Sequence, residues 1–151
     1  MPPSLAITPQ PAGRLEYRVF RSVNTRWEDN DSYGHVNNVV YFSWFDTAVN
    51  AYLMERGVLD IHGGPIIGLV VENHCNYFRP LAFPQTVEIG LRVEHIGRRS
   101  VRYGLAVFGP DQDAAQTAVA QGHFVHVYVD AESRQPCALP PSWRTILEHL
   151  Q

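Results

Sequence analysis

The central stretch of the chain, residues 37–57, reads NNVVYFSWFDTAVNAYLMERG and predicts one long helix over residues 39–56. The paired asparagines Asn37 and Asn38 supply N-cap chemistry, and Gly57 stands where helices commonly end. Apolar residues cover most of the helix circumference, because the polar ones form only a narrow stripe at spacings of three and four: Ser43, Asp46, Thr47 and Asn50. A helix this apolar has to be wrapped by other structure, so we expect it in the core.

Outside this helix the apolar residues recur with a period of two, which is typical of strands. One strand is expected before the helix, over residues 15–23, and four after it, over residues 66–78, 86–96, 101–107 and 117–129. Short connections between successive strands predict an antiparallel meander, because parallel neighbours need long crossovers. A short C-terminal helix is expected from Pro140. The prediction is an α+β fold in which one face of a curved sheet wraps the helix, while the uncovered outer face and edges favour a dimer or larger assembly.

Length and composition narrow the class of protein. The 151 residues suffice for one domain, expected over residues 14–151, and the proline-rich residues 1–13 are expected to form a flexible leader. A net charge of -3 argues against nucleic acid as a partner, because a duplex binder would carry a basic stripe. The sequence contains no apolar run long enough to predict a membrane span. Cys75 and Cys137 show no metal-binding spacing and no disulfide framework, which favours a reducing cytoplasm.

The chemically informative stretch is residues 27–38, WEDNDSYGHVNN, which leads directly into the helix. It places a carboxylate, Asp31, shortly before the turn glycine Gly34 and a helix N-terminus. The first N–H groups of a helix have no partner inside it and carry positive partial charge. Aimed at a carbonyl oxygen, they stabilise the oxyanion that forms on nucleophilic attack. A carboxylate a few residues upstream can make that attack or activate water for it. The arrangement suits acyl transfer.

The block DSYGHVNNVVYF, residues 31–42, resembles the signature of the 4-hydroxybenzoyl-CoA thioesterase family: an Asp, two residues, a Gly, usually a His, then a pair of Asn before the long helix. Supporting likeness continues through NYFRP at residues 76–80 and IGRRS at residues 96–100, so it spans roughly residues 15–130. The resemblance implies the hot-dog fold and hydrolysis of acyl-CoA without a metal or other cofactor. It also implies a homodimer or homotetramer with active sites at the subunit interface.

Carried over to this chain, the resemblance makes Asp31 the catalytic carboxylate, as nucleophile or general base. It assigns the thioester oxygen to the backbone N–H of Asn38. Further substrate contacts are implied around the helix start, at Gly34, His35, Val39 and Tyr41. The nucleotide end of CoA is commonly contacted by hairpin residues that correspond here to Arg98, Arg99 and Ser100.

Some of these residues also have plain structural interpretations. Asp31 could simply form a turn with its own backbone, as aspartates often do. His35 is more readily explained by local backbone bonding than by base chemistry, and Asn37 by capping than by substrate contact. Glu28 and Asp29 are rival carboxylates in the same stretch, and we expect their proximity to raise the pKa of whichever carboxylate is buried.

Other candidates lie outside that stretch. Asp46 on the polar stripe of the helix is a further rival, because other hot-dog thioesterases place their carboxylate on this helix. His123 and His126 lie three apart in a strand, so they should point to opposite faces and cannot form a simple metal pair. No serine or cysteine has the setting of a hydrolase nucleophile.

Two alternatives to hydrolysis stay open. One is hydration or dehydration of acyl thioesters, with His35 paired to Asp31, and the other is acyl-CoA binding without catalysis. The acyl group is not specified by the sequence, although aromatic residues could line its pocket: Tyr41, Trp44, Phe78 and Phe83.

Overall fold

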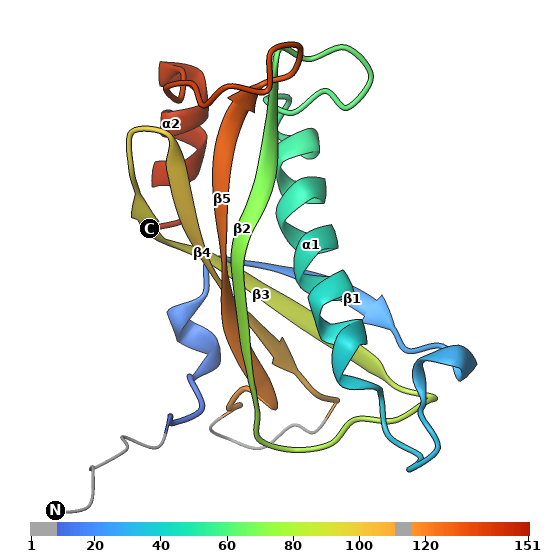
Figure 1. Cartoon of the computed structure of the whole chain (residues 1–151). Helices are drawn as coiled ribbons and strands as arrows, with labels where there is room; N and C mark the ends of the chain where they lie inside the picture. The colour runs from blue at the N-terminus through green and yellow to red at the C-terminus, as the bar shows by residue number, and fades with distance from the viewer. Residues whose placement is uncertain (1–8, 111–115) are drawn as a thin grey trace, which may run out of the picture.

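The computed structural model describes residues 9–110 and 116–151 as a five-stranded antiparallel sheet curved around one long helix (Figure 1). Its sheet order is β1-β3-β4-β5-β2. The elements in chain order are η1 (Arg14–Glu16), β1 (Val19–Asn24), η2 (Trp27–Asp29), α1 (Asn38–Glu55), β2 (Ile66–Tyr77), β3 (Thr86–Ile96), β4 (Ser100–Phe108), β5 (Ala120–Asp130) and α2 (Pro141–Glu148). The expected α+β hot-dog arrangement is confirmed.

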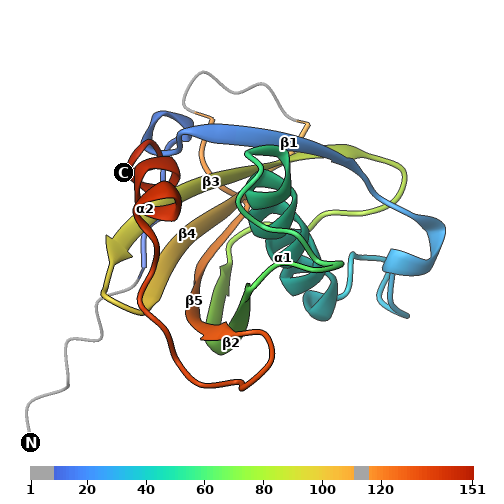
Figure 2. The same ribbon diagram turned by 90° about the horizontal axis from the view of Figure 1, so that it is seen from above.

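The core lies between α1 and the concave face of the sheet, as the view from above shows (Figure 2). Phe45 and Val49 on the helix are fully buried, and so is Ile89 on β3. Alternate residues of β3 face this core, as the sequence predicts: Val87, Ile89, Leu91 and Val93. The short helix α2 closes one end, where the ring of Trp143 lies 5.0 Å from that of Tyr128. Burial of apolar surface in this single cluster is the main source of stability.

The expected four-strand meander is wrong in one respect. Only β3, β4 and β5 form a meander, because β2 lies at the far edge of the sheet and pairs with β5 along its whole length. The connection over residues 78–85 therefore crosses from one side of the sheet to the other (Figure 1). The pairing of β2 also shifts register between Val70 and Glu72, which makes a bulge at Val71.

Element ends differ from the predictions by a few residues. The first strand begins at Val19 rather than at residue 15, because Arg14–Glu16 form a 3-10 turn in which the Glu16 carboxylate accepts the N–H of Gly13 at 2.6 Å. The last strand begins at Ala120 rather than at residue 117. The helix prediction holds at its C-terminus, where Gly57 has a φ of 77° that favours glycine.

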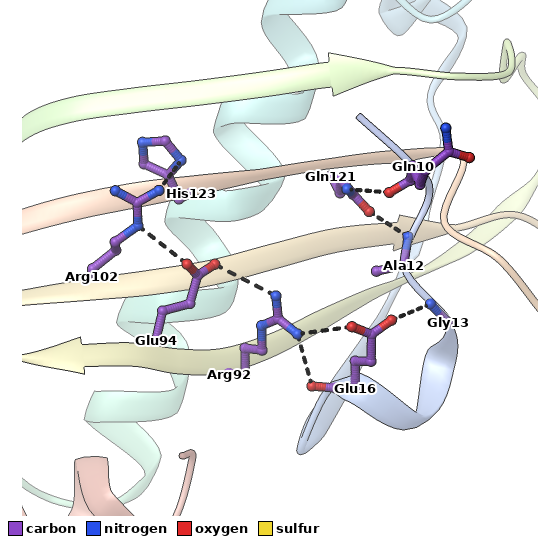
Figure 3. Close-up of polar contacts among 9 residues, drawn as sticks. All are labelled: Gln10, Ala12, Gly13, Glu16, Arg92, Glu94, Arg102, Gln121 and His123. Atoms are coloured by element: carbon purple, nitrogen blue, oxygen red, sulfur yellow. Dashed lines mark hydrogen bonds and ion pairs between the residues drawn. The ribbon is translucent and has the colours of Figure 1, made fainter. Parts of the chain in front are cut away.

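The outer face of the sheet is partly covered, contrary to the expectation that it is bare. Residues 10–17 lie across it, held by Gln121, which bonds the N–H of Ala12 at 2.6 Å and the carbonyl of Gln10 at 2.8 Å (Figure 3). Tyr17 packs edge-on against Phe108, with ring centroids 5.8 Å apart. Alternating charges run across the neighbouring strands through Glu16, Arg92, Glu94 and Arg102, and the Arg102 guanidinium bonds the ring of His123 (Figure 3). The 3-10 turn η1 is thereby tied to β3, β4 and β5.

The edge strand β2 stays exposed. Leu69, Val70 and Val71 leave 41%, 45% and 60% of their surface open, and the side of β2 away from β5 has no neighbour among the described strands. Within residues 9–110 and 116–151, no helix is long and apolar enough to cross a membrane.

Candidate active site

The loop before α1 is fixed by a buried carboxylate. Asp29 is only 1% exposed, and it accepts hydrogen bonds from the backbone N–H of Arg26 at 2.7 Å and from its guanidinium at 2.9 and 3.1 Å. Its carbonyl accepts the N–H of Asn37 at 2.8 Å, while Val36 donates to the carbonyl of Leu81 at 2.8 Å. These bonds tie both ends of the loop to the body of the domain. Asp29 is therefore a structural group, and it is a weaker candidate than Asp31 for the catalytic carboxylate.

Asp31 begins the tight turn of this loop, opposite His35. Its Oδ1 accepts the N–H of Tyr33 at 2.8 Å, its carbonyl accepts the N–H of Gly34 at 3.0 Å, and its own N–H donates to the carbonyl of His35 at 2.9 Å. Gly34 has a φ of 81°, which glycine adopts without strain. Asp31 thus does form the turn that a plain structural interpretation predicts. Only one carboxylate oxygen is used, however, because no donor among the described residues bonds Oδ2.

The start of α1 presents one unused backbone donor. Asn37 is the N-cap: its Oδ1 accepts the N–H of Val39 at 3.0 Å, and its carbonyl accepts the N–H of Val40 at 3.0 Å. The N–H of Asn38 has no acceptor among residues 9–110 and 116–151. Since the capping bonds hold the neighbouring N–H groups, Asn38 carries the donor left for a ligand at this helix end.

Tyr77, at the end of β2, supports the helix start from the other side. Its hydroxyl donates to the carbonyl of Asn38 at 2.9 Å, and its ring meets that of Tyr41 edge-on with centroids 5.0 Å apart. Desolvation and the neighbouring Cys75 raise the pKa of Tyr77, so its hydroxyl remains a donor at neutral pH. Burial also raises the pKa of Cys75 to about 11, and a protonated thiol is a poor nucleophile.

These groups line one groove of about 350 Å³. Its walls come from the loop, from the first turn of α1, and from the end of β2 with the residues after it. The lining residues are Asp31, His35, Val36, Asn38, Tyr41, Tyr77, Phe78, Arg79 and Pro80. A carboxylate with an uncommitted oxygen, an unpartnered helix N–H and an aromatic wall therefore share one surface, as attack on an acyl carbonyl requires.

The other predicted substrate residues are distributed unevenly. Val39 is 64% exposed but does not line the groove, and Gly34 lines a smaller hollow that Asp31 shares. The hairpin with Arg98, Arg99 and Ser100 lies near α2, at the end of the molecule away from the start of α1 (Figures 1 and 2). Within one chain it is not part of the groove.

Sequence reasoning missed Tyr77. The stretch at residues 76–80 carried weak family likeness, but nothing in it indicated that a hydroxyl at residue 77 would bond the first turn of a helix 39 residues earlier. Such a contact depends on the sheet order, which places the end of β2 beside the start of α1.

The other residues considered as catalytic or metal-binding candidates lie outside the groove. Asp46 is exposed on α1 and accepts a bond from Asn50 at 3.1 Å. His126 points into the core and is 2% exposed, whereas His123 lies on the outer face against Arg102, so the two histidines do point to opposite faces. Among the residues that the structure describes, no three His, Cys, Asp or Glu side chains are grouped to hold a metal ion.

Comparison with known proteins identifies the class to which this fold and groove belong. The family model described as the thioesterase-like superfamily matches residues 25–147. The chain therefore belongs to the thioesterase-like superfamily, a family named for thioester hydrolysis.

Individual relatives agree with this placement. The crystal structure of the PA5185 protein from Pseudomonas aeruginosa strain PAO1 is 53% identical, with a TM-score of 0.89, over 94% of this chain and 97% of that one. YneP of Bacillus subtilis strain 168, provisionally named an acyl-CoA thioesterase, is 23% identical over 85% of this chain and 94% of its own length. The DHNA-CoA thioesterase of Staphylococcus aureus shares the fold, with 21% identity and a TM-score of 0.74 over 85% of this chain and 87% of that one.

Proposed function

We propose that this chain hydrolyses an acyl-CoA thioester to a free acid and CoA, with Asp31 as the catalytic carboxylate. The observation that supports the proposal is the shared groove, which is lined both by Asp31, whose Oδ2 is uncommitted, and by Asn38, whose N–H is unpartnered among the described residues. The names of YneP and of the Staphylococcus aureus enzyme support CoA as the carrier. No cofactor beyond the substrate is needed for this chemistry.

In the proposed reaction the thioester carbonyl lies over the start of α1. Asp31 either attacks the carbonyl carbon or removes a proton from the attacking water. The negative charge that develops on the carbonyl oxygen is stabilised by the N–H of Asn38 and by the positive end of the helix. The thiolate of CoA then leaves. Tyr77 keeps the first turn of the helix in place through its bond to the Asn38 carbonyl.

The experiment that tests this proposal measures thiol release from short, medium, long and aromatic acyl-CoAs. Asp31→Asn keeps an oxygen that can accept the Tyr33 N–H, so the loop should retain its shape. We expect the rate to fall by at least about a hundredfold, as for the loss of a general base or nucleophile. The matched control is Asp46→Asn, which removes a carboxylate from the exposed stripe of α1 and should leave the rate unchanged. Equal rates for wild type and Asp31→Asn would reject the proposal.

The same variants separate the two alternatives. Hydration or dehydration would pair His35 with Asp31, and His35 does line the groove. That activity would change the absorbance of an unsaturated acyl thioester without releasing thiol. A binding protein would release no thiol, and its affinity for acyl-CoA would survive Asp31→Asn.

We also propose that two copies of the chain associate through β2. The strand leaves an edge with no neighbour among the described strands and three partly exposed apolar residues, and such an edge favours pairing with another strand. Because Arg98, Arg99 and Ser100 lie far from the groove of their own chain, they would contact CoA bound to a partner chain. Light scattering should give at least twice the chain mass of 17.1 kDa, and Val71→Lys should lower it while Leu15→Lys does not. A wild-type monomer would contradict this assembly.

The proposed location is the cytoplasm. Cys75 and Cys137 are both free thiols in the structure, which suits a reducing compartment.

A further inference from the structure

A second hollow lies between the edge strand β1 and the C-terminal half of α1. It encloses about 230 Å³ and shares no residue with the candidate groove. Ala48 in its wall follows Asn38 by ten residues, so the two lie roughly 15 Å apart along the helix axis. The hollow is therefore a separate site on the same helix, and we name it the β1–α1 slot.

The interior of the slot is apolar. Its walls are Val19 from β1, Ile89 and Leu91 from β3, and Ala48 and Tyr52 from α1. Ala48, Ile89 and Leu91 are at most 3% exposed and form its floor, so the apolar surface open to a ligand is mainly that of Val19 and Tyr52. The volume is below the roughly 300–1,000 Å³ of pockets for drug-sized ligands, so the slot has room for a single short or medium chain.

The mouth of the slot is charged. Arg21, Glu55 and Arg56 line it, and the first two form an ion pair. Arg56 is exposed, and no carboxylate among the described residues pairs with it. Its guanidinium lies over the ring of Tyr52, 5.2 Å from the centroid. The mouth therefore offers one planar cation that is not neutralised, directly above an apolar interior.

The free carbonyls at the C-terminus of a helix could neutralise part of the charge of Arg56, but here they have other partners. The N–H groups of residues 56–59 donate to the carbonyls of Tyr52, Leu53 and Met54, so those carbonyls are already engaged. The carboxylate of Glu55 is paired with Arg21, so the three side chains at the mouth carry one net positive charge. A ligand with a single negative charge balances it. A planar guanidinium also matches the two oxygens of a carboxylate.

We propose that the β1–α1 slot binds an aliphatic monocarboxylate, with the chain against Val19 and Tyr52 and the carboxylate at Arg56. Charge complementarity at the mouth and the small apolar interior carry this assignment. It goes beyond the proposed hydrolysis and does not depend on it, although the acid released from an acyl-CoA is of this chemical class.

The test is a calorimetric titration of the full chain with straight-chain acids of four, six, eight and ten carbons. Each methylene that enters the slot should raise the affinity about fourfold, and the gain should stop when the slot is full. Arg56→Gln should weaken octanoate binding about tenfold and leave 1-octanol binding unchanged, because only the charged bond is lost. The control Arg134→Gln should change neither. Asp31→Asn should bind octanoate like the wild type, which separates this site from the proposed catalytic one.

A second measurement locates the ligand without a core substitution. An octanoate analogue with a diazirine near its tail should label peptides from β1 or from the second half of α1. Absence of binding up to about 10 mM acid would overturn the proposal. Labelling of the peptides that hold Tyr41 and Tyr77 instead would also overturn it, because the acid would then occupy the candidate groove.

Discussion

Asn38→Pro isolates the backbone donor that the proposed mechanism requires. Proline has no N–H, so this substitution deletes the one unpartnered donor at the start of α1. Asn38 is the first residue of the helix, the position where proline is best tolerated. The preceding residue, Asn37, has a φ of -62° and a ψ of 140°, which a following proline allows. The caps that Asn37 provides do not involve the deleted N–H and should persist.

The expected result is a folded protein with a slow chemical step. Loss of one oxyanion donor costs about 2.7–4 kcal/mol, so kcat should fall roughly a hundredfold to a thousandfold. Folding stability should hold or rise by about 0.4–1 kcal/mol, because proline restricts the unfolded chain. The melting temperature should then rise by about 1–4 °C.

Thiol release and circular dichroism measure these two quantities on the same samples. Asn38→Ala is the matched control, since it removes the same side chain and keeps the N–H, and it should react within about threefold of the wild type. A folded Asn38→Pro variant as fast as this control would refute the reasoning, because the oxyanion donor would then have to lie elsewhere.

Three further results are expected. Tyr77→Phe keeps the ring and removes the bond to the Asn38 carbonyl. In the thiol-release assay kcat should therefore fall about five- to tenfold with little change in KM. An unchanged kcat would argue against positioning of the helix start by Tyr77. Asp29→Ala should lower the free energy of unfolding in urea by about 2–4 kcal/mol, because it removes a buried, hydrogen-bonded carboxylate. The control Glu28→Ala, on the surface, should change it by less than about 0.5 kcal/mol. Equal losses would contradict the structural role of Asp29. Burial lowers the pKa of His126 to about 4, so the unfolded chain binds the additional proton between about pH 6.5 and 4. The free energy of unfolding should therefore decrease as the pH is lowered from about 6.5 to 4, by up to roughly 3 kcal/mol. A series of denaturant titrations should show a smaller decrease in His126→Gln.

The local parts of the fold follow from the sequence because their causes are local. The limits of α1 come from a capping asparagine, an apolar run and Gly57, all of which adjoin the helix. Strand β3 follows from strict alternation of apolar and polar residues. The sheet order does not follow, because β2 could pair with β3 or with β5 and the alternation is the same in either case. Short connections suggested the wrong neighbour.

The same distinction applies to the candidate site. Asp31 and Asn38 are seven residues apart on one loop, so one motif specifies both, and the motif places them in one groove. Tyr77 reaches that groove only through the sheet order, and sequence reasoning missed it. The structural duty of Asp29 was also unpredictable, because its partner Arg26 bonds it through a 3-10 turn that the pattern did not reveal.

The turn at Asp31 affects the chemical stability of the Asp31→Asn variant during storage. Asp31→Asn would create an asparagine followed by Ser32 in a partly exposed loop, and the bond from the Tyr33 N–H would hold the amide folded back along its own backbone. Attack of the Ser32 nitrogen on that amide expels ammonia, and hydrolysis of the resulting cyclic imide regenerates aspartate in part. An inactive preparation would then recover wild-type enzyme during storage. A mass increase of about 1 Da that grows in step with thiol-release activity would trace that recovery to chemical repair of the variant.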